Sequence, residues 1–539
     1  MHDSGALAVP AELEPLLQPN GVPASALTAL FQPLPFLLVG GGDVRLGVSP
    51  ITKMNVYGCQ PAPRPHALAF SSSTATSVSE RAYLRALQAR DELIQESISK
   101  GFVAAFDDQI ERMRTSLTAY LNLGGCKTEI VFSPSGTDSQ LHALFLSRQL
   151  LGGPVSSVIV GADQTGSGTV HTSRGRHFSD WTAQGKTVAK GQPIEGQSEE
   201  THSVGIDLFA PDGAIRSESE IDAAVVEAVA EQIWMGNKVV LQTMDSSKLG
   251  WRAPSDACLK EITARWPNGV LIVIDACQMR IGRPRLKEYV NRGYVVLITG
   301  SKFFTGPAFC GASLWPEALS ARIATMSAIP GGLADYATRF DMPLCWASLR
   351  DALPPEPNFG QWLRWEAALE EIRDYYALPE SYRSYTLLRL AEATEKAISS
   401  SRHLVLLKER DASGSLFRED MPPTVSSFFI LRNNRLLELD EMTKLYHALN
   451  GDLAGALPGT AADDDRALAS VICHIGQPVK LPAGTVLRIG IGARLLTEAW
   501  CADGIIADAN IGAAIAKIKT VVKKIDLLVA TNAHLGKPQ

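Results

Sequence analysis

Short apolar runs that alternate with helical segments constrain the fold of this chain more than any other feature. The runs span 129–132, 155–160, 238–242, 270–274 and 294–298. A strand that is apolar at every position is buried on both faces, which is typical of a parallel sheet covered by helices on each side. Helical periodicity falls between the runs and before them, at 79–99, 106–121, 137–150, 167–175 and 255–265. We therefore expect an α/β fold with a mostly parallel sheet.

The pattern changes twice along the chain. The first part is rich in proline and glycine and shows little periodicity, apart from a short helix expected near 11–17. From about residue 360 long helices and short strands replace the regular alternation. The predicted units are an irregular N-terminal extension (1–66), a large α/β domain (67–345) and a small α+β domain (346–539).

A final helix is expected over 505–529. Its four lysines, at positions 517, 519, 523 and 524, fall on the polar side of the helical pattern. Such a charged face is more often solvated than a binding site, so we expect all four ammonium groups to face water.

Composition excludes several classes of function. The 539 residues carry 51 Lys and Arg against 57 Asp and Glu, a net charge of −6 that argues against a general nucleic-acid binder. The sequence contains neither an apolar stretch of about 20 residues nor a basic segment followed by an apolar one. The eight cysteines are scattered without a CxxC pair, so we expect free thiols, no metal site, no membrane contact and a cytoplasmic location.

The first candidate site follows the run 129–132, in the segment FSPSGTDSQLHAL. Ser135, Gly136 and Thr137 lie where a strand ends and a helix begins. Glycine permits close approach, and free amide groups at a helix N-terminus favour an anion such as phosphate. The same residues also form a good helix N-cap without any ligand, so both interpretations stay open.

Two charged residues follow two further strands. Asp275 ends the run 270–274, where an unpaired carboxylate would be costly. It either caps a turn or pairs with a cation, in the protein or on a ligand. Lys302 follows the run 294–298 among phenylalanines. Either its stem packs while its ammonium group reaches solvent, or it reacts with a ligand.

The segment 135–137, Asp275 and Lys302 are expected to meet at one edge of the predicted sheet, because the carboxyl ends of parallel strands lie together. One cofactor needs all three groups. Pyridoxal phosphate has a phosphate, a pyridine nitrogen that pairs with a carboxylate, and an aldehyde that forms a Schiff base with lysine. The combination therefore favours pyridoxal phosphate over the simpler interpretation of each piece.

At this point the sequence resembles the fold-type I pyridoxal-phosphate enzymes, and within them the class V aminotransferase and cysteine desulfurase family, over about 67–530. The resemblance implies a seven-stranded type of sheet in the large domain. It also implies that Lys302 forms the Schiff base, that Asp275 contacts the pyridine nitrogen, and that Gln278 binds the phenolic oxygen. A homodimer is expected on the same ground.

The resemblance extends to the phosphate contacts. Gly136 and Thr137 match the family's phosphate loop, and Thr299 and Ser301 match the phosphate-binding positions of its S-x-H-K motif. The segment that follows a Gly-Thr-Pro in the family begins here after Glu356, so a threonine contact from a neighbouring subunit is not expected.

Other positions match less closely. Thr165 stands near the place of a histidine that stacks on the ring, and Asp245 stands where the family often has an asparagine near the cofactor. Arg488 matches the arginine that binds the substrate carboxylate. Cys473 lies close to the position of the sulfur-accepting cysteine, but its apolar neighbours favour a buried packing role.

The extension allows two interpretations as well. In the segment 55–65, Tyr57 and Arg64 could reach the substrate, or the segment packs as a surface arm against the small domain, which is the more common case.

These observations predict a pyridoxal-phosphate-dependent enzyme that acts on an amino acid through Lys302, by transamination or by lyase-type α/β chemistry. Alternatives are a decarboxylating or carbon–carbon bond-forming enzyme of the same fold, and a scaffold without turnover. The bond that breaks depends on its alignment with the ring, which the sequence does not reveal.

Overall fold

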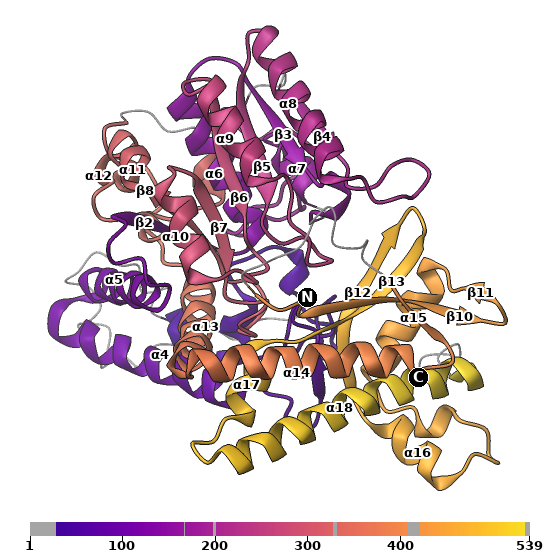
Figure 1. The fold of residues 1–539 in the computed structure, drawn as a ribbon. Coiled ribbons are helices and arrows are strands. Elements are labelled where there is room, and N and C mark those ends of the chain that lie inside the picture. Colours follow the sequence, from indigo (N-terminus) through magenta and orange to yellow (C-terminus); the bar gives the residue numbers. More distant parts are fainter. Residues whose placement is uncertain (1–27, 167, 198–200, 327–330, 408–420, 534–539) are drawn as a thin grey trace.

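The computed structural model describes residues 28–166, 168–197, 201–326, 331–407 and 421–533 (Figure 1). The helix expected near 11–17 lies outside these ranges. Among the described helices none combines the length and the apolar character needed to cross a bilayer.

A seven-stranded sheet forms the centre of the upper part of Figure 1. Its order is β2-β8-β7-β6-β5-β3-β4, and the neighbouring strands from β7 to β4 are parallel, while β8 runs antiparallel to β7 and β2. The expected mostly parallel sheet is confirmed. The strands are β2 (Thr128–Ser133), β3 (Val155–Val160), β4 (Ser203–Ile206), β5 (Lys238–Met244), β6 (Val270–Asp275), β7 (Val295–Thr299) and β8 (Gly311–Pro316).

Helices bury both faces of this sheet. Along β7, Val295 and Leu297 belong to one core cluster, whereas Val296 and Ile298 belong to the other, as the alternation of side chains along a strand requires. The helices are α6 (Gly136–Leu151), α7 (Thr169–Thr172), α8 (Glu218–Trp234), α9 (Asp256–Arg265), α10 (Arg283–Asn291), α11 (Glu317–Ala324) and α12 (Ala347–Asp351).

A second sheet has the order β1-β12-β13-β10-β11, with β9 paired to β10. Its first strand, β1, pairs in parallel with β12, although the sequence placed this segment at the start of the large domain. The chain therefore contributes a strand to the second sheet before it forms the strands of the seven-stranded sheet. The strands are β1 (Leu68–Phe70), β9 (Leu404–Leu406), β10 (Val425–Arg432), β11 (Arg435–Leu436), β12 (Cys473–Leu481) and β13 (Gly484–Gly490).

Long helices support the second sheet and join it to the first. Helices α14 and α18 run side by side along the lower part of Figure 1, and α13 packs against α4 and α5. The helices are α4 (Glu80–Lys100), α5 (Phe102–Tyr120), α13 (Phe359–Ala377), α14 (Glu380–Ser399), α15 (Leu439–Leu449), α16 (Asp463–Ser470), α17 (Ala493–Ala499) and α18 (Gly504–Thr531).

One lysine of α18 is buried, contrary to the expected solvated face. The ammonium group of Lys524 donates to the main-chain oxygens of Leu449 (3.2 Å), Gly451 (2.8 Å) and Val471. The carbonyls at the end of α15 lack helical partners, and this lysine satisfies them. The other three lysines of the set are exposed, as expected.

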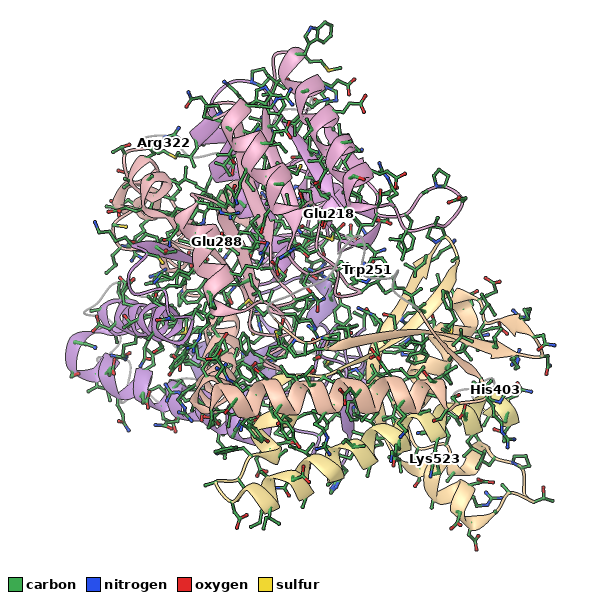
Figure 2. All side chains as sticks on the ribbon, viewed as in Figure 1. Glu218, Trp251, Glu288, Arg322, His403 and Lys523 are labelled. Atoms are coloured by element: carbon green, nitrogen blue, oxygen red, sulfur yellow. The ribbon has the colours of Figure 1, made fainter. Side chains whose placement is uncertain are left out.

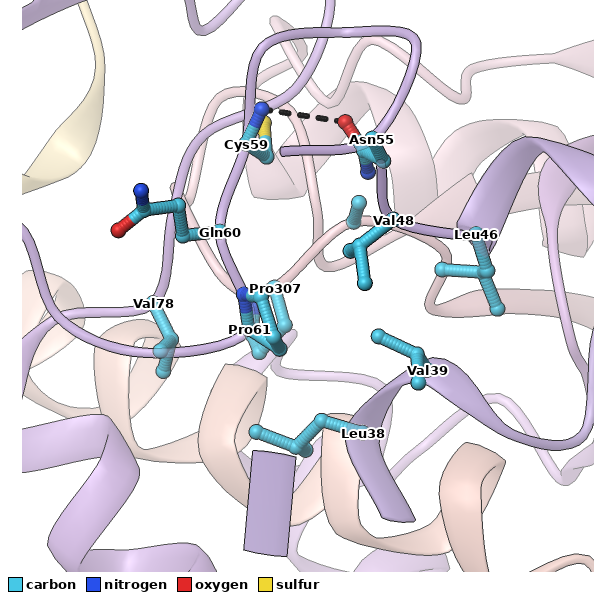
Figure 3. Close-up of a pocket in the computed structure, with 11 residues that line it drawn as sticks. Leu38, Val39, Leu46, Val48, Asn55, Cys59, Gln60, Pro61, Val78 and Pro307 are labelled. Carbon is cyan, nitrogen blue, oxygen red and sulfur yellow. Dashed lines mark hydrogen bonds between the residues drawn. The ribbon is translucent and has the colours of Figure 1, made fainter. Parts of the chain in front are cut away.

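The described part of the N-terminal extension packs into the molecule. Helix α3 (Leu34–Val39) is followed by two glycines whose carbonyls, with that of Leu38, accept hydrogen bonds from the buried guanidinium of Arg364 on α13. Figure 3 shows the extension folded around a cavity of about 20 Å³, where the Oδ1 atom of Asn55 accepts from the main-chain nitrogen of Cys59 at 3.1 Å. Pro307, from the loop after β7, closes the same cavity.

Candidate active site

A pocket of about 490 Å³ opens at the carboxyl ends of the parallel strands. Segments that follow β2, β3, β5, β6 and β7 line it, together with the extension and strands of the second sheet. The structure brings Lys302, Asp275 and Thr137 into this one pocket, as the shared strand edge predicts. Its volume is in the range of pockets that hold small molecules.

The predicted anion loop lies at the N-terminus of α6, a helix of 16 residues. Ser135 is its N-cap, and its hydroxyl accepts from the main-chain nitrogen of Asp138 at 3.2 Å. A Cβ atom at Gly136 would lie 2.8 Å from the Sγ atom of Cys277, so the loop can approach the segment after β6 this closely only with glycine at this position. The helix N-terminus and its hydroxyl groups therefore form a compact anion cradle with Thr137.

The cradle contains a cation that the sequence pattern did not indicate. Arg45, from the extension, places its Nη1 atom 3.3 Å from the Oγ1 atom of Thr137 and its Nη2 atom 3.4 Å from the Oγ atom of Ser135. Asp43 holds this guanidinium in place, with its Oδ1 atom 2.7 Å from Nε. Burial, reinforced by the nearby Asp43, raises the pKa of Asp138 to about 7.

Asp275 is held by hydrogen bonds and has no ion-pair partner among the described residues. Its Oδ1 atom accepts from the main-chain nitrogen of Cys277, and its Oδ2 atom accepts from the Nε2 atom of Gln140, both at 3.0 Å. The Oε1 atom of Gln140 accepts in turn from Thr169 (2.9 Å) and Thr172 (3.2 Å). The carboxylate is thus oriented, and no cation of the described chain pairs with it.

Lys302 lines the pocket, and its side chain makes no hydrogen bond or ion pair within the described ranges. Burial lowers the pKa of its ammonium group to about 8, and the neighbouring Arg488 and Arg280 act in the same direction. Cys277 and Asp275 oppose this shift. The amine is therefore partly neutral, and hence nucleophilic, close to physiological pH.

The polar residues beside Lys302 are already positioned. Gln278 donates from Nε2 to the carbonyl of Ser73 at 3.1 Å, and Thr299 donates from Oγ1 to the carbonyl of Cys277 at 2.7 Å. Thr165, which donates to the carbonyl of Ala162, and Ser301 also line the pocket. All four predicted residues thus lie at the site.

Arg488, on β13, reaches the pocket from the second sheet. Its guanidinium donates to main-chain oxygens of Gln477 (3.1 and 3.2 Å) and Lys248 (3.1 Å) and to the hydroxyl of Thr74 (3.0 Å). Burial lowers its pKa to about 10. Its Nη1 atom also donates to the main-chain oxygen of Ser73 at 3.4 Å, so each of its nitrogen atoms has an acceptor in the protein. No carboxylate of the described chain forms an ion pair with this arginine, so its positive charge is not neutralised there.

Asp245, which the sequence predicts near the cofactor, does not line the pocket. Its neighbours Met244 and Ser246 line the pocket, but the Oδ2 atom of Asp245 accepts from Tyr289 (2.9 Å) and Arg285 (3.3 Å) of α10. The carboxylate of Asp245 therefore points toward α10 and not into the pocket.

The extension contributes more than a surface arm. Tyr57 lines the pocket, and its carbonyl accepts from Tyr446 and His474, both at 2.8 Å. Arg64 does not reach the pocket, since it donates instead to the Oδ1 atom of Asn450 at 2.8 Å. The tyrosine of the segment 55–65 is therefore part of the site and the arginine is structural.

Cys473 is fully buried in β12 and is not among the residues that line the pocket. Burial raises the pKa of its thiol to about 11. This placement agrees with a packing cysteine, because a thiol must ionise to act as a nucleophile.

The seven-stranded sheet, the second sheet and the pocket at the strand edge define a class of fold. It is the fold-type I fold of pyridoxal-phosphate-dependent enzymes, as the sequence predicts. Oryza sativa TDC, solved with PLP and tryptamine, matches with a TM-score of 0.50 and 13% identity over 87% of this chain and 85% of that chain.

Two further solved structures are similar. The ureidoglycine-glyoxylate aminotransferase of Bacillus subtilis has a TM-score of 0.49 and 12% identity, over 87% of this chain and 94% of its own. A NifS-like protein from Rickettsia africae has a TM-score of 0.48 and 11% identity, over 85% and 100%. No protein-family model and no curated protein sequence matches the chain.

Proposed function

We propose that this protein is a pyridoxal-phosphate-dependent enzyme that acts on an amino acid, by transamination or by lyase-type chemistry. One observation carries the proposal. A lysine without a protein partner, an oriented carboxylate and an anion cradle face the same pocket, and pyridoxal phosphate needs these three groups.

The donor chemistry fits the cofactor at each end. A phosphate suits the N-terminus of α6, with the hydroxyl groups of Ser135 and Thr137 and the guanidinium of Arg45. A protonated pyridine nitrogen suits Asp275, whose carboxylate has no other cation to neutralise it among the residues described. Lys302 supplies the amine for the aldehyde.

Pyridoxal phosphate, when bound, supplies an aldehyde that reacts with amines and a ring that accepts electrons from a bond at the substrate's α-carbon. The protein supplies the rest. Arg488 binds the α-carboxylate with its guanidinium, and the Nζ atom of Lys302 accepts the α-proton when it is neutral and returns it when it is protonated. Its pKa of about 8 makes both protonation states accessible near neutral pH.

Reconstitution of the purified protein with pyridoxal phosphate tests the proposal. We expect a visible absorption band, and borohydride reduction followed by peptide mass analysis should place the cofactor on Lys302. Lys302→Ala is the control and should bind the cofactor without covalent attachment. A reduced adduct spread over surface lysines, or on no lysine, would contradict the proposal.

Product analysis separates the reaction types. Turnover that needs an α-keto acid indicates transamination, turnover without it indicates a lyase, and release of carbon dioxide or a new carbon–carbon bond indicates the alternatives. An amino acid that shifts the absorption band excludes a scaffold that has lost its chemistry. A band that no amino acid shifts would favour the scaffold.

A further inference from the structure

A second lysine, Lys248, lines the pocket that contains Lys302 and Arg488. It follows β5, and its side chain makes no hydrogen bond or ion pair with any residue that the structure describes. The proposed function gives a role to Lys302 and to Arg488 but none to this side chain. An ammonium group without a partner in a pocket costs free energy of folding, and for Lys248 this cost needs another explanation.

The backbone holds Lys248 at a fixed position. In the turn that carries it, the Oγ atom of Ser247 accepts from the main-chain nitrogens of Leu249 (3.1 Å) and Trp251 (3.2 Å). The main-chain nitrogen of Ser247 donates to the carbonyl of Trp251 at 2.7 Å. Trp251, labelled in Figure 2, is buried, and Arg488 binds the carbonyl of Lys248. The main chain that carries this side chain is therefore preorganised, as is typical of a binding group.

Lys248 is mostly a cation at neutral pH, although its surroundings lower the pKa of its ammonium group. Burial lowers the pKa of its ammonium group to about 8, and Arg488 and Lys302 lower it further, whereas Asp163 opposes them. Asp163 accepts from the main-chain nitrogen of Leu208 at 3.1 Å and forms no ion pair with this lysine. Because pH 7 lies below this pKa, most molecules carry the charge on Lys248.

The pocket has more positive than negative charge. Its lining includes the cations Arg45, Lys248, Lys302 and Arg488 and one carboxylate, Asp275. In the proposed function the cofactor phosphate faces Arg45, the aldehyde reacts with Lys302, and the substrate's α-carboxylate binds Arg488. Lys248 remains without an anion, so a neutral amino acid would leave a desolvated charge unpaired.

We propose that Lys248 binds a second anionic group, at the end of the substrate's side chain. The substrate class is then an amino acid with a side-chain carboxylate, sulfonate or phosphate. This inference rests on the proposed function, because it assigns the α-amino and α-carboxylate groups to Lys302 and Arg488. The anion forms a charge-assisted hydrogen bond to the Nζ atom of Lys248.

Titration of the cofactor's absorption band with matched pairs of amino acids tests this inference. The pairs are aspartate with asparagine, glutamate with glutamine, cysteate with serine, and O-phosphoserine with serine. We expect the anionic member of at least one pair to bind about 10- to 100-fold more tightly than its neutral partner. The pair with the largest ratio identifies the anion.

The ratio of the two affinities is compared between the wild type, Lys248→Gln and Lys248→Arg. We expect it to fall to about one in the glutamine variant and to persist in the arginine variant. In the wild type it should drop about tenfold between pH 7 and pH 9, as Lys248 loses its proton. Cofactor loading and the melting temperature of each variant show that the pocket is intact.

A wild-type ratio near one for every pair would overturn the inference, as would a ratio that Lys248→Gln leaves unchanged. Either result leaves the proposed function in place, because the cofactor band still responds to amino acids. Absence of the band in the wild type is a different result, which rejects the proposed function and this inference together.

Discussion

Lys302 combines two properties that a solvated lysine lacks, namely burial and the absence of a protein partner. Its pKa falls from 10.5 to about 8, so the folded protein binds fewer protons than the unfolded chain between these two values. The protonated side chain therefore destabilises the folded protein without cofactor at neutral pH, and its stability rises with pH through this window. The residue is retained for chemistry at a cost in stability.

Replacement of Lys302 by methionine should therefore stabilise the cofactor-free protein at pH 7, by about 1 to 2 kcal/mol once its partial exposure is taken into account. The gain should shrink as the pH rises from 8 towards 10.5 and vanish above that range, where the lysine is neutral in both states. Urea unfolding at pH 7 and pH 9.5 measures the difference. Lys519→Met, at an exposed position of α18, is the control and should change little. A loss of stability at pH 7 would contradict this account.

At the scale of elements, the site depends on where strands end. Three loops of different sequence converge because parallel strands place their carboxyl ends at one edge, and the N-terminus of α6 adds its amide groups there. These elements are the part of the site that the sequence predicts well. The loops are packed so closely that Gly136 cannot accept a Cβ atom without a shift of Cys277.

Gly136→Ala should displace the cradle, because the new Cβ atom would lie 2.8 Å from the Sγ atom of Cys277 and 3.3 Å from the Cγ2 atom of Thr299. We expect pyridoxal phosphate to bind at least about tenfold more weakly, since its phosphate contacts depend on this geometry. Equilibrium titration of the cofactor measures the change. Unchanged affinity would show that the phosphate lies elsewhere.

Gly512→Ala provides the matched control for that substitution. Gly512 lies within α18, and no atom outside its own helix lies within 4 Å of the added Cβ atom. Alanine should stabilise this helix by about 0.5 to 1 kcal/mol and leave cofactor affinity unchanged. Equal effects of the two substitutions on cofactor affinity would show that the close contact at Gly136 has no role.

At the scale of the whole molecule, the pocket is assembled from the extension and both sheets. Arg45 and Tyr57 come from a segment that the sequence assigned to an irregular extension, and Arg488 comes from the last strand of the second sheet. The rim includes apolar side chains that face solvent in the single chain. Val56 lines the pocket and is 54% exposed, and Val170, next to Thr169 of the lining, is 56% exposed.

We propose that a second copy of the chain covers this rim in a homodimer. Sedimentation should give twice the chain mass of 58.0 kDa, and Val56→Asp should weaken association at least about tenfold, because a buried carboxylate without a partner is costly. Ile505→Asp, at an exposed position at the start of α18, is the control. A monomer at micromolar concentration would reject the dimer.

By itself, the sequence determined the parallel sheet and the edge at which Thr137, Asp275 and Lys302 meet. Both follow from local patterns, since an apolar run specifies a buried strand and the residue after it specifies what lies at the strand end. Only the tertiary structure decided that Arg45 joins the same site from 92 residues before Thr137, and that Lys248 stays unpaired there. Contacts of this kind depend on the path of the whole chain, which leaves no local pattern in the sequence.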